Sequence, residues 1–233
     1  MLKSVIAAVA AAALIAQEKP LPDAAALQRM AARFAPTEIS ADISRLSATD
    51  RRVLAKLVEA SKIMDALFLR QVWAGNDAML LDLIRDDTPA GRARLHSFLI
   101  NKGPWSRIDH NQPFVPGAPS KPEGANFYPA GSSKAEVERW LQSLPDGERA
   151  RASGFFTLIR RGQNGAFLIV PYSVEYQNEL LLAATKLREA AALATEPTLK
   201  AFLTRRADAF LSDRKSTRLN SSHIQKSRMP SSA

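Results

Sequence analysis

NKGPWSRIDHNQPFVPGAPSKPEGANFYP, residues 101–129, is the long irregular stretch of a chain that otherwise follows mostly helical patterns. It holds six of the chain's 14 prolines. Long loops inside a compact domain are uncommon, and they are usually functional or disordered. This loop is too rich in aromatic residues for a disordered linker. Those residues are Trp105, Phe114, Phe127 and Tyr128. We therefore expect an ordered loop between two helical regions.

The region before the loop predicts a long central helix. Apolar residues recur at helical spacing from Val53 to Phe68, and Ser47 stands at a position where it can cap the helix. Gly75 is expected to end this helix in the left-handed conformation. Asn76 is then expected to cap a short helix, and Thr88-Pro89 to begin the helix that leads into the loop.

The region after the loop predicts further helices and one β-hairpin. Ser133 and Glu136 form a capping-box pattern before a helix. Two β-type runs flank Asn164-Gly165, the dipeptide most typical of tight hairpin turns. Ser173 is expected to cap a long helix, and the segment from Thr195 to Pro197 to begin a final one. These patterns predict a mainly α fold (α+β), a multi-helix lobe with a small β-hairpin and a second short hairpin near residues 105–114.

Composition divides the chain into four segments. Residues 1–16 combine a lysine, an apolar run and small residues, which is typical of a signal peptide. Residues 17–23 form a linker, and residues 24–213 the folded part. Residues 214–233 lack any periodic pattern and are interpreted as a disordered tail, which resembles translated sequencing-adaptor DNA. A signal peptide on a chain without cysteine predicts a periplasmic or secreted bacterial protein, with no membrane span after cleavage.

The formal net charge of +9 does not indicate a nucleic-acid-binding protein. The segment 214–233 carries five basic residues and no acidic residue. The rest of the chain has 27 basic against 23 acidic residues, a net charge of +4. Because the excess basic charge lies in the tail, we expect no nucleic-acid partner.

Residues 17–213 offer few candidates for catalysis or metal binding. Their only histidines are His96, expected to be partly buried beside the inner face of its helix, and His110, expected in a turn. Zinc sites need three or four converging ligands, and no spacing here supplies them. Arg160 and Arg161, beside the hairpin turn, are interpreted as a solvated end. We therefore predict no catalytic and no metal-binding residue in this chain.

The loop supplies the candidate substrate-binding residues. They are Trp105, Arg107, Asn126 and Tyr128. Aromatic rings and a guanidinium group can line a cleft through stacking and paired hydrogen bonds. The alternative is that the aromatic side chains only attach the loop to the helical body.

Five sequence runs carry a family resemblance, and they occur in order over residues 33–213. They are FAPTEI (34–39), FLRQVW (68–73), NKGPWSR (101–107), GANFYP (124–129) and RADAFLS (206–212). Together they resemble the N-terminal part of bacterial zinc hydrolases similar to dipeptidyl peptidase III. The resemblance covers the folded part of this chain but less than half of a full-length family member.

The resemblance implies a two-lobed exopeptidase that releases dipeptides from the N-termini of short peptides. It implies zinc as cofactor, held by a helical His-Glu motif and a later glutamate. This sequence ends before such a motif, so no catalytic or metal residue carries over to it. We expect the 233-residue chain to be an inactive fragment of that enzyme, with an exposed apolar surface such as the Phe202/Phe210 face. The rival hypothesis is a non-enzymatic periplasmic binding module that uses the loop.

Overall fold

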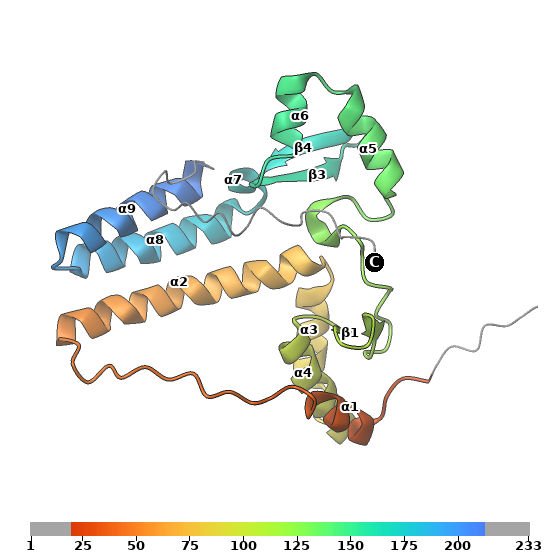
Figure 1. Ribbon diagram of the computed structural model, residues 1–233, viewed down its shortest axis with the longest axis horizontal. Coiled ribbons are helices and arrows are strands. Elements are labelled where there is room, and N and C mark those ends of the chain that lie inside the picture. The colour runs from red at the N-terminus through yellow and green to blue at the C-terminus, as the bar shows by residue number, and fades with distance from the viewer. Residues whose placement is uncertain (1–19, 213–233) are drawn as a thin grey trace, which may run out of the picture.

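The computed structural model describes residues 20–212 (Figure 1). This part of the chain is helical, with two short antiparallel hairpins. The segments predicted as a signal peptide and a tail, 1–16 and 214–233, lie outside it. The helices are α1 (Ala24–Ala31), α2 (Ala48–Val72), α3 (Asn76–Arg85), α4 (Pro89–Asn101), α5 (Lys134–Ser143), α6 (Asp146–Ala152), α7 (Tyr172–Glu175), α8 (Gln177–Leu193) and α9 (Pro197–Ser212). The other elements are the 3-10 turn η1 (Ala125–Phe127) and strands β1 (Trp105–Ser106), β2 (Gln112–Pro113), β3 (Thr157–Arg161) and β4 (Phe167–Pro171).

Helix α2 begins as the sequence predicts but ends differently. The Ser47 hydroxyl accepts a hydrogen bond from the Asp50 backbone N–H at 3.0 Å, which caps the helix. Gly75 is not left-handed, because its φ is −83°. The helix instead ends at Trp73, whose backbone is extended. A side chain at position 75 would overlap the Trp73 ring at 2.3 Å, so glycine is needed there for space.

Helices α2, α8 and α9 pack side by side, with α8 between the other two (Figure 1). Ala184, Ala190 and Ala207 are completely buried in the core that the three helices share. Because alanine side chains are small, the helix axes can approach closely and bury a continuous apolar seam.

The other helices before the loop form a second core, and the loop closes it. Phe98 of α4 and Phe114 of the loop are almost completely buried there, together with Leu27 of α1. Trp105 packs edge-on against Trp73, with ring centroids 5.5 Å apart. Its indole Nε1–H donates to the Pro119 carbonyl at 2.7 Å. The loop is thus an ordered part of the core.

Strands β3 and β4 form the larger hairpin, with Ile159 opposite Ile169. One face of the hairpin meets α5, where Trp140 packs edge-on against Phe167. The other face directs the buried Leu158 toward Leu67 of α2 and Leu180 of α8. The hairpin therefore lies between α5 and the long helices, which confirms the predicted mainly helical lobe with a small hairpin.

Two expected helix caps are wrong. Gly75, not Asn76, precedes α3, and the buried Asn76 amide donates to the Leu69 carbonyl at 2.9 Å. The same carbonyl also accepts from the Trp73 N–H at 3.2 Å, so Asn76 adds a second hydrogen bond at the end of α2. Ser173 does not cap a long helix either, because α7 is a single turn that follows Pro171. The backbone leaves the helical conformation at Tyr176, between α7 and α8, and the Tyr176 side chain is completely buried.

The long apolar helices of a membrane protein are not found in the described range. No helix within residues 20–212 is long and apolar enough to cross a bilayer.

Candidate functional site

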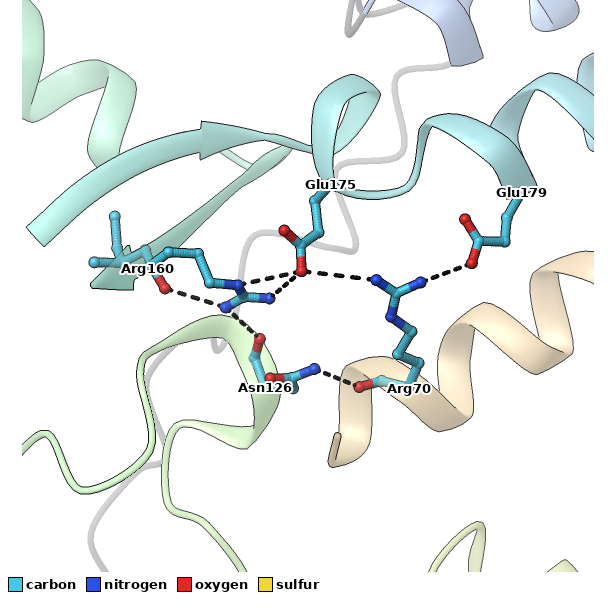
Figure 2. A network of polar contacts seen from close by, with 6 residues as sticks. Arg70, Asn126, Arg160, Glu175 and Glu179 are labelled. Carbon is cyan, nitrogen blue, oxygen red and sulfur yellow. Dashed lines mark hydrogen bonds and ion pairs between the residues drawn. The ribbon is translucent and has the colours of Figure 1, made fainter. Parts of the chain in front are cut away.

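Arg160 of β3 lies at the centre of a polar network that joins four separate segments (Figure 2). Its guanidinium group donates to Glu175 Oε1 of α7 from two nitrogens, at 2.8 and 3.2 Å. Its third nitrogen, Nη1, donates to the Asn126 carbonyl of η1 at 3.0 Å. The side chains of Arg160 and Glu175 are each only 22% exposed. Because water screens this pair little, it constrains the hairpin against α7 and η1 more firmly than a surface pair would.

Arg70 of α2 extends the same network to α8. Its Nη1 lies 2.7 Å from Glu179 Oε1, and its Nη2 lies 3.9 Å from Glu175 Oε1. Its guanidinium carbon stands 5.3 Å from the centroid of the Tyr176 ring, a cation–π contact. The Arg70 carbonyl accepts from Asn126 Nδ2 at 2.8 Å. Asn126 thus contacts both arginine residues through its backbone and its side chain.

Tyr176 forms the apolar floor beneath these charges. It is completely buried. Burial, with a smaller effect from neighbouring Tyr172, raises the pKa of Tyr176 to about 12. The hydroxyl therefore stays protonated at neutral pH and is not a candidate general base.

The η1 turn that positions Asn126 has a strained backbone, and residues of the GANFYP run allow it. Ala125 has a φ of +48°, in the left-handed region that a non-glycine residue rarely adopts. Gly124 precedes it because a side chain there would meet Tyr128 Cδ2 at 2.8 Å. The turn thereby directs both the carbonyl and the side-chain amide of Asn126 into the network.

The network contains two arginine and two glutamate residues, so its formal charges cancel. Each guanidinium group already has a carboxylate partner, and each carboxylate a guanidinium partner. Such a closed set of charges can position segments, but it does not leave a free base or an unpaired anion site. We therefore assign the network to the architecture of the lobe.

The structure gives separate positions to the four candidate substrate-binding residues. Trp105 is buried against Trp73, and Arg107 is exposed, with its Nε donating to the Asn101 carbonyl at 3.1 Å. Tyr128 is half-buried beside Gly124, and Asn126 belongs to the network. Only Asn126 thus joins a larger cluster, and contact of these four residues with a substrate stays a prediction.

The interpretation of Arg160 as part of a solvated end is wrong. Leu158 and Arg160 are two residues apart on a strand, so both face the same side of the hairpin. Since Leu158 is completely buried, Arg160 follows it toward the helices. That alternation was the sequence signal for this residue. Arg161, on the opposite side, pairs with Glu136 of α5 at 2.7 Å.

One small hollow lies between α3, α4 and the loop. Its volume is about 210 Å³, and its lining includes Asp82, Asp86 and Arg94. Pockets for small molecules usually measure roughly 300–1,000 Å³. The Asp86 carboxylate accepts from the N–H and the hydroxyl of Thr88, the residue that caps α4, and these hydrogen bonds lower the pKa of Asp86. The Asp86 carboxylate in this hollow is thus already hydrogen-bonded at the start of α4.

Zinc does not fit the residues that the structure describes. Within residues 20–212, no three histidine, cysteine, aspartate or glutamate side chains converge as metal ligands. His96 is exposed, contrary to its expected partial burial, because α4 turns Ser97 and Phe98 inward instead. His110 is exposed in the turn between β1 and β2, as expected. No step of a reaction is therefore assigned to a metal on these residues.

Two solved structures are similar to this chain in sequence and fold. The first is dipeptidyl peptidase III from Corallococcus sp. strain EGB, 59% identical over 83% of this chain, with a TM-score of 0.81. The second is DPP III from Caldithrix abyssi, 40% identical over 82% of this chain, with a TM-score of 0.76. The resemblance inferred from the sequence runs is confirmed: this chain is similar in sequence and fold to one part of dipeptidyl peptidase III. It spans 36% of the length of each protein.

A curated plant protein, Nudix hydrolase 3 from Arabidopsis thaliana, is 32% identical over 80% of this chain. The matched region spans 31% of that protein, about a third of its length. Its name therefore need not describe the matched third. No family model matches the chain.

Proposed function

We propose that this chain is the N-terminal part of an exported, zinc-dependent hydrolase that releases dipeptides from the N-termini of short peptides. The observation that carries the proposal is the 59% identity with a bacterial dipeptidyl peptidase III, over 83% of the chain and at a TM-score of 0.81. Identity at this level over one continuous fold supports a shared activity for the complete proteins.

In this proposal the described lobe forms one wall of a peptide-binding cleft. Zinc would be held by residues outside this chain, where it would polarise the peptide carbonyl and activate water. The residues described here hold the wall in shape through the network of Arg70, Asn126, Arg160 and Glu175. The 233-residue chain by itself is then inactive, because it supplies the wall without the catalytic groups.

A chimeric enzyme tests the activity. Residues 20–212 replace the matched 36% of the Corallococcus protein, and release of dipeptides from a short peptide is measured with and without a zinc chelator. We expect chelator-sensitive release by the chimera and by the unaltered Corallococcus protein, and none by the 233-residue chain. A folded chimera that releases no dipeptide would contradict the proposal.

Export is tested separately by N-terminal sequencing of the protein from bacterial cells. Cleavage is expected after Ala13 or Ala16, where small residues follow the apolar run. A periplasmic protein whose N-terminus is the residue directly after Ala13 or Ala16 supports export. A cytoplasmic protein that begins with Met1 contradicts it.

A binding module that uses the 101–129 loop is the less favoured function. The Trp105 ring is buried against Trp73 rather than presented to a ligand, and the loop closes a core. These contacts favour a loop whose aromatic residues hold it to the lobe.

A further inference from the structure

The hydrogen-bond pattern of the β3–β4 hairpin determines which backbone groups point outward. The Tyr172 N–H donates to the Phe156 carbonyl, and the Gly162 N–H donates to the Ala166 carbonyl. In an antiparallel pair, hydrogen-bonded and non-hydrogen-bonded residue pairs alternate. The pair Ile159–Ile169 is therefore non-hydrogen-bonded, and its backbone groups point away from the partner strand.

The outer edge of β4 consists of the outward backbone groups of Phe167 and Ile169. None of these groups has a hydrogen-bond partner among residues 20–212. The outer edge of β3 is different, because the Ile159 carbonyl accepts from Arg160 Nη1 at 3.1 Å. Within the described range β4 also contacts α7 at its end, and α5 through the Phe167 ring, which packs against Trp140 on one face of the hairpin. Figure 1 shows the hairpin as a ribbon of two strands beside α5 and α6.

The sequence of β4 protects its outer edge at one end only. Natural edge strands carry charged residues, prolines, bulges or inward-pointing charges that prevent further pairing. Residues 166–172 read AFLIVPY, so Pro171 ends the strand but no charge lies along it, whereas β3 ends in two arginines. Leu168 is 47% exposed, and Val174 of the following turn is 64% exposed. The uncharged edge from Phe167 to Ile169, beside exposed apolar side chains, favours a strand that is covered in a longer protein.

We propose that the outer edge of β4 pairs with a third strand, contributed by the part of a dipeptidyl-peptidase-III-like polypeptide that this chain lacks. The inference rests on the proposed function, because it assumes a longer protein of that kind. The length of the relatives supports this occupant, since this chain spans only 36% of each solved protein. Two strands alone are marginally stable in water, and a third strand stabilises such a ribbon.

Amide hydrogen exchange tests the third strand directly. The N–H groups of Leu168 and Val170 face β3, whereas those of Phe167 and Ile169 face outward. In the 233-residue chain we expect the outward pair to exchange much faster than the inward pair. In the chimera with the Corallococcus protein, exchange of the outward pair should slow by at least about tenfold. Equal rates for the outward pair in both proteins would overturn the proposal.

A matched pair of variants tests the backbone donor itself. Ile169→Pro removes the outward N–H, whereas Ile169→Ala shortens the same side chain and keeps it. The melting temperature of the chimera should fall further with Ile169→Pro than with Ile169→Ala. The 233-residue chain should respond almost equally to both, because no strand uses that donor there. An equal response in the chimera would contradict a third strand at this edge.

The outcomes separate this inference from the proposed function. A chimera that releases dipeptides but leaves the outward amides unprotected defeats the third strand alone. A folded chimera with protected amides and no dipeptide release defeats the activity alone, and a chimera that does not fold counts against both. Protection that appears in the 233-residue chain as its concentration rises would assign the edge to a second copy, and would overturn the proposed occupant.

Discussion

The two ends of the α2–α8 pair carry the same kinds of charge but use them differently. At one end, Lys56 and Glu59 of α2 meet Lys186 and Glu189 of α8 in a square of ion pairs, 2.8 to 3.3 Å long. At the other end, Arg70 and Arg160 share Glu175 with segments from four parts of the chain. The square links two helices, and its glutamates are 44% and 38% exposed. The network links α2, η1, β3 and α7–α8, and its central pair of Arg160 and Glu175 is only 22% exposed.

Similar ion pairs at the two ends should therefore affect stability unequally. The carboxylates of the square are more exposed than Glu175, and exposed pairs contribute little to stability. In the network, Glu175 is 22% exposed and bonds to Arg160 through two nitrogens. Removing a partner there leaves a poorly hydrated charge unpaired, which costs more than the bond itself contributed. The network should therefore control the lobe's stability, and the square should adjust it slightly.

The largest effect is expected from Glu175→Ala. It leaves Arg160 without its carboxylate partner, so the free energy of unfolding should fall by about 2 kcal/mol. Urea denaturation of the 233-residue chain measures this change. Glu179→Gln is the matched control, since Arg70 and Glu179 are each 33% exposed, and it should cost less than about 1 kcal/mol. Equal losses for the two variants would remove the distinction between a shared and a simple carboxylate.

A smaller loss is expected from Asn126→Ala. The variant removes the amide that donates to the Arg70 carbonyl but keeps the backbone carbonyl that Arg160 contacts. One hydrogen bond of this kind contributes about 1 kcal/mol. The same urea titration checks the value, with Asn178→Ala at an exposed position of α8 as the comparison. If Asn126→Ala changed stability no more than Asn178→Ala, η1 would not be part of the network.

The opposite sign is expected from Ala125→Gly. Ala125 has a φ of +48°, and glycine adopts that conformation without the steric cost of a side chain. The gain should be roughly 0.5–1 kcal/mol after the greater flexibility of glycine in the unfolded chain is included. Ala135→Gly, within α5, provides a control in which glycine should destabilise the protein by a similar amount. A loss at position 125 would mean that the turn is not strained.

The smallest effect is expected at the square, and it should depend on pH. The hydrogen bond from Lys56 lowers the pKa of Glu189, and that from Lys186 lowers the pKa of Glu59. A lowered folded-state pKa gives stability that is present above the unfolded-state pKa of 4.5 and is lost as pH falls through the folded-state value.

Glu189→Gln should therefore lower the melting temperature slightly at neutral pH, and this effect should disappear as the pH falls below the lowered pKa of Glu189 in the folded protein. Added salt should reduce the difference at neutral pH, because exposed pairs are screened. A loss at neutral pH as large as that of Glu175→Ala would reverse the comparison between the two ends.

The sequence predicted local features better than the site. The cap at Ser47, the β3–β4 hairpin and the aromatic loop all depend on residues close together in the chain, and each is present. The network was missed because its members are far apart: Arg70 and Glu179 are 109 residues apart, and Arg160 and Asn126 are 34 apart. The alternation of Leu158 and Arg160 was the one local signal, and two adjacent arginines beside a turn obscured it.

The helical class, the hairpin and the resemblance to dipeptidyl peptidase III could be read from the sequence, because periodicity, turn residues and short runs act locally. The roles of the polar and glycine residues emerged only from the packing of the folded chain. There, Gly75 leaves space for the Trp73 ring and is not a left-handed cap, and the Asn76 amide bonds to α2 and does not cap α3. The physical reason is that burial sets which donors, charges and strand edges need partners, and burial depends on the packing of segments distant in sequence.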